Sequence, residues 1–178
     1  MKSPCFEFPF IGDEKSIELI EMLLACTPNP YSRVQFQPGH LTATGLVLHP
    51  DGQAIAMVLH GRLHRWLLPG GHVEEEDTDI LAAAAREVLE ETGLVVHSAA
   101  IIGADVHGIP PKFKSGVLVE PYHLHHDVLV ACRTDQTDLL ISPESKDLKW
   151  IHPPDFDAYA VPQNVRRGYA RMLARVSQ

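Results

Sequence analysis

Residues 70–94 carry the most informative pattern in the chain: Gly70-Gly71-His72-Val73-Glu74, then Asp77, then Arg86-Glu87-Val88-Leu89-Glu90-Glu91-Thr92-Gly93-Leu94. Residues 77–92 predict a helix, because the run of alanines at 82–85 favours helix strongly and Asp77 or Thr78 can cap its first turn. Gly93 stands just past its end, where glycine is common. Residues three and four apart lie side by side on a helix, so the stretch predicts a face that carries three carboxylates: Glu87, Glu90 and Glu91.

Three carboxylates on one helix face repel one another, so their arrangement requires an explanation. Like charges at this spacing cost roughly 0.2–0.5 kcal/mol per pair on an exposed helix. A divalent cation reverses that balance, because Mg²⁺ prefers oxygen ligands and bridges to substrate phosphates. Arg86 lies four residues before Glu90 and can orient its carboxylate, and the two glycines allow a main-chain carbonyl to approach as a further ligand. A solvated acidic helix face is the simpler interpretation, but it does not account for the glycines, the Arg-Glu pair and the terminal glycine in one ordered array.

The array from Gly71 to Leu94 resembles the Nudix box: a Gly, five residues, a Glu, seven residues, then Arg-Glu-apolar-x-Glu-Glu-x-Gly-apolar. The right half matches at every position, whereas the left half has Asp77 in place of the first Glu and one extra residue before Arg86. The resemblance implies that Glu87, Glu90, Glu91 and the backbone of Gly71 bind the metal, and that Arg86, Glu90 and Glu91 take part in catalysis. Family members often hold another carboxylate ahead of a Trp-containing strand, which here points to Glu144, six residues before Trp150.

The same resemblance implies a hydrolase that cleaves the diphosphate linkage of a nucleoside diphosphate derivative by attack of water on phosphorus. Its expected cofactor is Mg²⁺, with Mn²⁺ as an alternative, and its expected partner is a small phosphorylated nucleotide-like substrate. Two other functions stay open: a Nudix-fold module that binds a nucleotide without cleaving it, and an enzyme similar to the isopentenyl diphosphate isomerases. The first would be expected to lack box carboxylates, and the second needs a catalytic cysteine, for which Cys132 lacks the setting.

Around the box, the pattern predicts an α+β fold in which helices sandwich a mixed, Nudix-like β-sheet, with an extra N-terminal helix. Turn residues at 50–52 join two β-rich runs into a hairpin. We expect one domain, residues 1–178, made of an N-terminal helical extension (1–38) and a core (39–178). The expected helices are 13–27, 77–92 and 164–176, the expected strands are 41–49, 54–60, 66–68, 94–106, 123–133 and 148–151, and residues 112–121 are expected to be a connecting segment.

The strand at 122–128 is rich in histidine. Alternation along a strand places His123, His125 and Asp127 on one face. Three interpretations compete: residues of the substrate pocket, a transition-metal site, and a polar strand face without function. We prefer the pocket and rank a dedicated zinc site last. Asp127 is an alternative to Glu144 as the general base, and Lys112 and Lys114 are candidates to meet distal phosphates of the substrate.

Composition limits the partners. With 15 Lys and Arg against 23 Asp and Glu the formal charge is −8, which would repel duplex nucleic acid. No apolar run approaches the ~18 residues of a membrane span, and the N-terminus lacks a signal-peptide pattern. The three cysteines are far apart and odd in number, so we expect reduced thiols and a cytoplasmic protein. The sequence leaves monomer and homodimer open.

Overall fold

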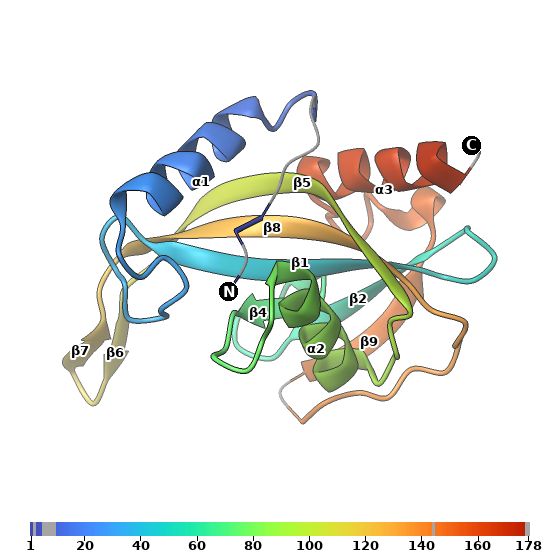
Figure 1. The fold of residues 1–178 in the computed structure, drawn as a ribbon. Coiled ribbons are helices and arrows are strands. Elements are labelled where there is room, and N and C mark those ends of the chain that lie inside the picture. The colour runs from blue at the N-terminus through green and yellow to red at the C-terminus, as the bar shows by residue number, and fades with distance from the viewer. Residues whose placement is uncertain (2, 5–9, 144, 177–178) are drawn as a thin grey trace.

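The computed structural model describes residues 1, 3–4, 10–143 and 145–176. Figure 1 shows a twisted mixed sheet with helices packed around it, which confirms the predicted α+β class and the N-terminal helix. The elements are α1 (Glu14–Cys26), β1 (His40–Leu48), β2 (Ile55–His60), β3 (Trp66–Leu67), β4 (Gly70–His72), α2 (Ile80–Thr92), β5 (Ser98–Ile109), β6 (Lys112–Lys114), β7 (Val117–Glu120), β8 (His123–Arg133), β9 (Ser145–Ile151), a short 3₁₀ turn η1 (Pro153–Asp155) and α3 (Gln163–Val176).

The main sheet has the strand order β3-β2-β1-β8-β5, with β4 added to β1 and β9 to β2. Strands β1 and β8 run parallel along their whole shared length, while the other pairs are antiparallel. Strands β2 and β4 share the other edge of β1: Leu48 pairs with Ile55 of β2, whereas residues 42–44 pair with β4. The double glycine of the box, on β4, is therefore held against the first half of β1, and both β1 and β8 lie between it and β5.

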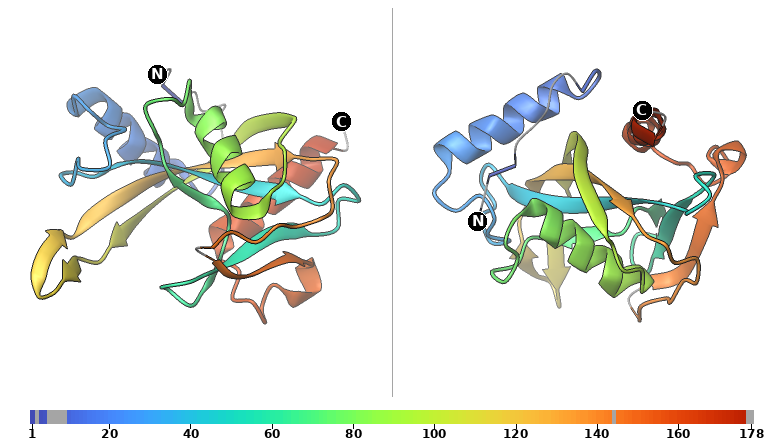
Figure 2. Two further views of the ribbon diagram at one scale, coloured as in Figure 1. Left: turned by 90° about the horizontal axis from the view of Figure 1, so that it is seen from below. Right: turned by 45° about the vertical axis from the view of Figure 1, so that its right-hand side comes forward.

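Two apolar clusters fill the two faces of this sheet. The first joins α1 and α2 to the face of β8 that carries Val128, Val130 and Cys132. The second joins α3 to the opposite face, around Leu46 and Leu129. Both views in Figure 2 show the helices distributed around the curved sheet rather than gathered on one side.

Helix α2 lies close against β1. A Cβ at Gly45 would come within 2.3 Å of Cγ2 of Val88, so only glycine allows this approach. Gly93 ends the helix in the left-handed region at φ 73°, as the sequence predicted. The close contact fixes the carboxylate-bearing helix relative to the strand that also holds β4.

Two predictions about elements were wrong in detail. Helix α2 begins at Ile80 rather than at 77, because Asp79 is the capping residue and accepts hydrogen bonds from the amides of Leu81 and Ala82, both at 3.0 Å. Residues 112–121 are not an irregular connection, since β6 and β7 form a two-stranded hairpin that projects from the main sheet (Figure 1).

Candidate active site

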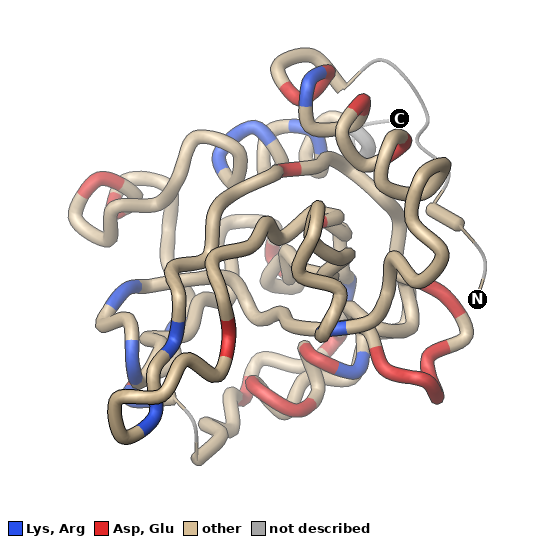
Figure 3. The backbone as a smooth tube through the Cα atoms, turned by 90° about the vertical axis from the view of Figure 1, so that its left-hand side faces the viewer, with Lys and Arg blue, Asp and Glu red and all other residues tan. Residues whose placement is uncertain are grey.

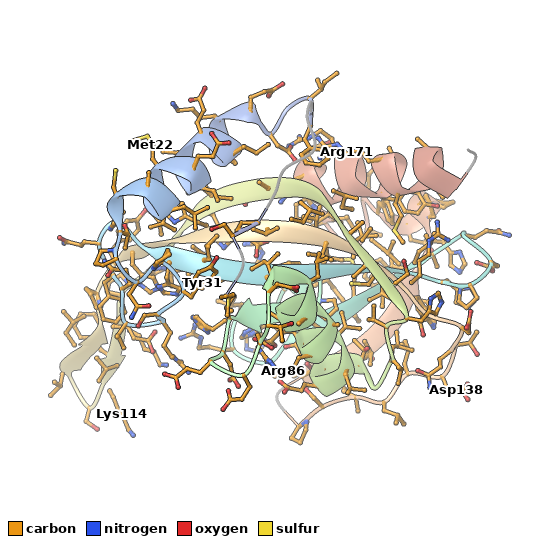
Figure 4. All side chains as sticks on the ribbon, in the orientation of Figure 1. Met22, Tyr31, Arg86, Lys114, Asp138 and Arg171 are labelled. Carbon is orange, nitrogen blue, oxygen red and sulfur yellow. The ribbon has the colours of Figure 1, made fainter. Side chains whose placement is uncertain are left out.

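Arg86 is the centre of the box. Its Nε and Nη2 donate to the two carboxylate oxygens of Asp77 at 3.1 and 3.0 Å, and Nη2 also donates to the carbonyl of His72 at 2.8 Å. Its Nη1 donates to Glu87 at 3.0 Å and to Glu90 at 3.2 Å. These ionic hydrogen bonds raise the pKa of Arg86 further above its ordinary value, led by the bond to Asp77. One guanidinium thus links α2 to the loop before it and to β4 (Figure 4).

Asp77 takes the position that the box reserves for its first Glu. It is the sixth residue after Gly71, as the pattern requires, and the extra residue falls between Asp77 and Arg86. Its carboxylate is buried, forms the paired contact with Arg86 and accepts the amide of Glu74 at 2.9 Å. The departure from the pattern therefore leaves the ion pair intact and displaces only the start of the helix.

The glycine pair lies directly over the carboxylate face of α2. The amide of Gly70 donates to Glu91 at 3.2 Å. A Cβ at Gly71 would lie 2.6 Å from Oε1 of Glu87, so any other side chain would push into the carboxylate. The structure brings together five of the residues predicted from the sequence: Gly71, Arg86, Glu87, Glu90 and Glu91.

Burial gives these carboxylates different environments. It raises the pKa of Glu87 above its ordinary value, although the hydrogen bond from Arg86 acts in the opposite direction. The side chain of Glu90 is 57% exposed and that of Glu87 only 14%. A cation beside a buried carboxylate favours its charged form and so opposes the effect of burial.

The donor set fits a hard divalent cation. Glu87, Glu90, Glu91 and the main chain at Gly71 offer only oxygen atoms, which Mg²⁺ prefers. The carboxylate of Glu87 can approach the backbone this closely because residue 71 has no side chain. Burial disfavours the charged form of the Glu87 carboxylate, and a cation bound beside it would stabilise that form.

The histidine-rich strand β8 pairs with the edge of β1 opposite to the one that β4 occupies. Asp127 is buried, and its Oδ1 accepts hydrogen bonds from Thr42 and Thr44, both at 2.8 Å. Burial raises its pKa, and the two threonine bonds only partly offset that effect. His123 and His125 lie on the same face, as the sequence predicted, and their rings are 5.2 Å apart.

Sequence reasoning missed three members of this histidine cluster: His40 on β1, His72 on β4 and His107 on β5. Their rings lie 4.9, 5.2 and 5.7 Å from that of His125. Burial, with the neighbouring imidazoles, lowers the pKa of His125 to about 2. The pairing of His40 with His125 follows from the parallel register of β1 and β8, which leaves no sign in the local sequence.

Of the remaining predicted residues, the two lysines lie on β6, in the β6–β7 hairpin. Lys112 donates to Glu120 at 2.9 Å within the β6–β7 hairpin, and Figure 4 shows Lys114 at the outer end of that hairpin. Glu144 lies outside the described residues. Cys132 is buried on the apolar face shared with α2, and burial raises the pKa of its thiol to about 12, which does not suit a catalytic cysteine.

Comparison with known proteins identifies the fold. The NUDIX domain family model matches residues 39–176. The structure is similar to an Ap4A hydrolase of C. elegans (TM-score 0.52, 18% identity, 77% of this chain and 97% of that chain). It is also similar to the NUDIX domain of NrtR from Shewanella oneidensis in complex with ADP ribose (0.57, 18%, 88% and 97%) and to a MutT protein from Bacillus halodurans (0.52, 22%, 74% and 79%).

No curated protein matches the chain. Every described helix is too short or too polar to cross a membrane. The match over residues 39–176 includes the whole box, with the arginine-centred network and the carboxylate face described above. The chain therefore belongs to the Nudix hydrolase family, whose enzymes hydrolyse pyrophosphate bonds.

Proposed function

We propose that this protein uses Mg²⁺ to hydrolyse the diphosphate linkage of a small nucleoside diphosphate derivative, with Mn²⁺ as an alternative ion. The observation that carries the proposal is the arrangement of Glu87, Glu90 and Glu91 beneath Gly70 and Gly71, held by Arg86. Ap4A and ADP ribose, named for two of the similar structures, set the substrate class to test first.

The residues of the box have separate tasks in this proposal. Glu87, Glu90, Glu91 and the Gly71 carbonyl hold the cation, which when bound neutralises the diphosphate and activates water. Arg86 keeps Glu87 and Glu90 oriented through its hydrogen bonds. Glu144 accepts the proton of the attacking water, with Asp127 as the alternative base.

The substrate pocket in this proposal extends along the β8 face that carries His123, His125 and Asp127, and Lys112 and Lys114 of the hairpin meet the distal phosphates. Figure 3 shows Lys and Arg gathered mainly at the lower left and along the top of that view, and a run of Asp and Glu at the lower right. The net charge of −8 supports a small substrate rather than duplex nucleic acid.

The test is phosphate release from nucleoside triphosphates, ADP-ribose, dinucleoside polyphosphates and sugar nucleotides, measured with Mg²⁺, with Mn²⁺ and in excess chelator. We expect turnover of at least one diphosphate derivative, and only with metal. Glu91→Gln should remove most of this activity, because the amide keeps the shape but loses the charge that binds the cation.

The matched control is Glu21→Gln, the same change at an exposed position on α1. It should keep wild-type kcat. Undiminished turnover in chelator, or a normally folded Glu91→Gln protein with wild-type kcat, would show that the carboxylate face is not the catalytic metal site.

A further inference from the structure

A second group of ligand-forming side chains lies on β1 and β8, next to the ring of His72 on β4. His40, His123 and His125 each place a ring nitrogen within 4.8 Å of the others. Their ring centroids are 4.9 to 5.2 Å apart. His40 and His123 are buried and His125 is half-buried, so this is an interior cluster rather than a chance meeting of surface side chains.

Hydrogen bonds fix the protonation of two of these rings. Nδ1 of His40 lies 3.2 Å from the carbonyl of Gln35, and Nδ1 of His123 lies 2.8 Å from the carbonyl of Pro121. A carbonyl can only accept, so Nδ1 carries the proton in both rings and Nε2 is left with its lone pair. Ligand histidines in metalloproteins almost always donate their other N–H to such a carbonyl or carboxylate.

The lone pair of His40 has no protein partner. Its Nε2 is completely buried and forms no hydrogen bond within the part of the chain that the structure describes. A buried polar atom without a partner costs about 1–3 kcal/mol. A bound cation would remove this cost, because it accepts the same lone pair.

The backbone holds the cluster from two sides. His40 and His125 are direct neighbours in the parallel register of β1 and β8. Gly39, just before His40, lies so close to β8 that a Cβ would be 2.1 Å from the carbonyl oxygen of Leu124. The ring of Phe36 covers His123 at 5.2 Å. The three imidazoles are therefore positioned by rigid elements and not by flexible loops.

We propose that His40, His123 and His125 bind a transition-metal ion of the zinc class, His40 and His123 through Nε2. Imidazole nitrogen suits Zn²⁺, whereas the all-oxygen box suits Mg²⁺, so the two sites select different ions. Three protein ligands leave a coordination position for water or for an oxygen of a bound molecule, as in catalytic zinc sites. The sequence alone ranked a zinc site last for the histidine-rich strand, and this assignment is compatible with the proposed substrate pocket because the open coordination position can take an oxygen of a bound molecule.

The test uses the full-length protein, stripped with chelator and titrated with Co²⁺ and then with Zn²⁺. We expect stoichiometric Co²⁺ binding with visible d–d absorption, displacement of Co²⁺ by Zn²⁺, and a Zn²⁺-dependent rise in Tm. His123→Gln and His125→Gln should each weaken Zn²⁺ binding at least about 10–100-fold, because loss of a ligand exceeds the loss of an outer partner. The rise in Tm is measured on the wild-type protein, so it does not depend on the variants folding.

The matched control is His126→Gln, which changes the neighbouring histidine on the opposite face of β8 and should bind Zn²⁺ like wild type. Glu91→Gln should also leave the Co²⁺ spectrum unchanged. No nucleotide enters these measurements, so their failure leaves the proposed hydrolase activity intact. Two results would overturn the zinc site: no Co²⁺ or Zn²⁺ effect on the wild-type protein, or variants at 123 and 125 that bind Zn²⁺ as tightly as the wild-type protein does.

Discussion

Arg86 uses three nitrogen atoms to make five hydrogen bonds, and those bonds reach Asp77, His72, Glu87 and Glu90. Only a planar guanidinium supplies donors in so many fixed directions. A lysine at this position would keep the charge but lose the paired contact with Asp77. The position of β4 over the carboxylates depends on this geometry as well as on the charge.

We expect Arg86→Lys to lower kcat/KM about 100-fold, because misplacement of catalytic groups by about 1 Å has effects of that size. Loss of hydrogen bonds to charged groups should also lower the free energy of unfolding by about 1.5–3 kcal/mol. Steady-state kinetics and urea unfolding measure the two effects. The same substitution at the exposed Arg65 is the control, and equal behaviour of the two variants would contradict the role given to Arg86.

For single residues, the sequence predicted the arrangements that depend on helical spacing. Glu87, Glu90 and Glu91 share a face because they lie within one turn of a helix. It did not predict that Thr42 and Thr44 bind Asp127, which is 85 and 83 residues away from them. It missed the contact between His40 and His125 for the same reason. Such contacts arise from the register of non-neighbouring strands, and no local pattern encodes that register.

The two candidates for the general base are Asp127 on strand β8 and Glu144. Asp127 is fixed within the sheet and already accepts two threonine hydroxyls. Glu144, which the sequence predicts to be in a loop, lies outside the described residues. A base needs a lone pair that reaches water, and Asp127 is buried with its Oδ1 engaged by both threonines, so we prefer Glu144.

We therefore expect Glu144→Gln to lower kcat by about 10²–10⁴ with little change in KM, as loss of a general base does. Asp127→Asn should keep kcat within a few-fold, because the amide oxygen can still accept from Thr42 and Thr44. Kinetics of both variants at saturating Mg²⁺ decide the matter. A large loss of kcat for Asp127→Asn alone would move the base onto β8.

The elements themselves were largely predictable, and the exceptions have identifiable causes. Both Asp77 and Asp79 can cap a helix. Arg86, nine residues after Asp77, binds the carboxylate of Asp77, and Asp79 is the residue that caps the helix. The hairpin of β6 and β7 has Ser115 and Gly116 at its turn, both at positive φ. The two prolines before it suggested an irregular segment, and the short strands that follow them are too brief to show alternation.

At the scale of the whole molecule, α1 belongs to the main core although it precedes the residues that the family model matches. Ile17, Ile20 and Leu23 pack in the same cluster as the residues under α2. We propose on this basis that residues 1–178 fold as one domain, with 39–178 as its core and 1–38 as an extension that completes it.

Asp13 supports this proposal, because it joins both ends of the chain. Its side chain is 1% exposed and binds Arg167 at 2.8 Å and Arg171 at 2.7 Å. Its Oδ2 also accepts the amide of Ala104 on β5 at 3.2 Å. Asp13 precedes α1 in the capping position, yet its carboxylate makes no capping bond and is used for these long-range contacts instead.

We expect Asp13→Asn to lower the free energy of unfolding by about 3 kcal/mol at pH 7, the lower end for a broken buried pair because the arginines touch solvent. Urea unfolding measures it, and circular dichroism and tryptophan fluorescence should report one shared transition if there is one domain. Asp135→Asn, at a side chain 94% exposed, should change stability by less than about 0.5 kcal/mol.

The same residue predicts a dependence on pH. Burial alone would raise the pKa of Asp13, but the bonds from Arg171, Arg167 and the Ala104 amide hold it below its ordinary value of 3.8. A lowered pKa gives stability that is complete above that value and is lost as pH falls through the folded-state pKa. The difference in stability between wild type and Asp13→Asn should therefore persist down to about pH 4 and shrink below it. A difference that is constant to lower pH would contradict the ion pair.

The contact between Asp13 and Arg171 also bears on the order of folding during synthesis, because 158 residues separate the two. At about 5–20 residues per second, a ribosome delivers Asp13 about 8–30 s before Arg171. During that interval the carboxylate has no guanidinium to accompany it into the interior, and burial of an unpaired charge is costly. We therefore expect helix α1 to dock stably on the sheet only after α3 has been synthesised.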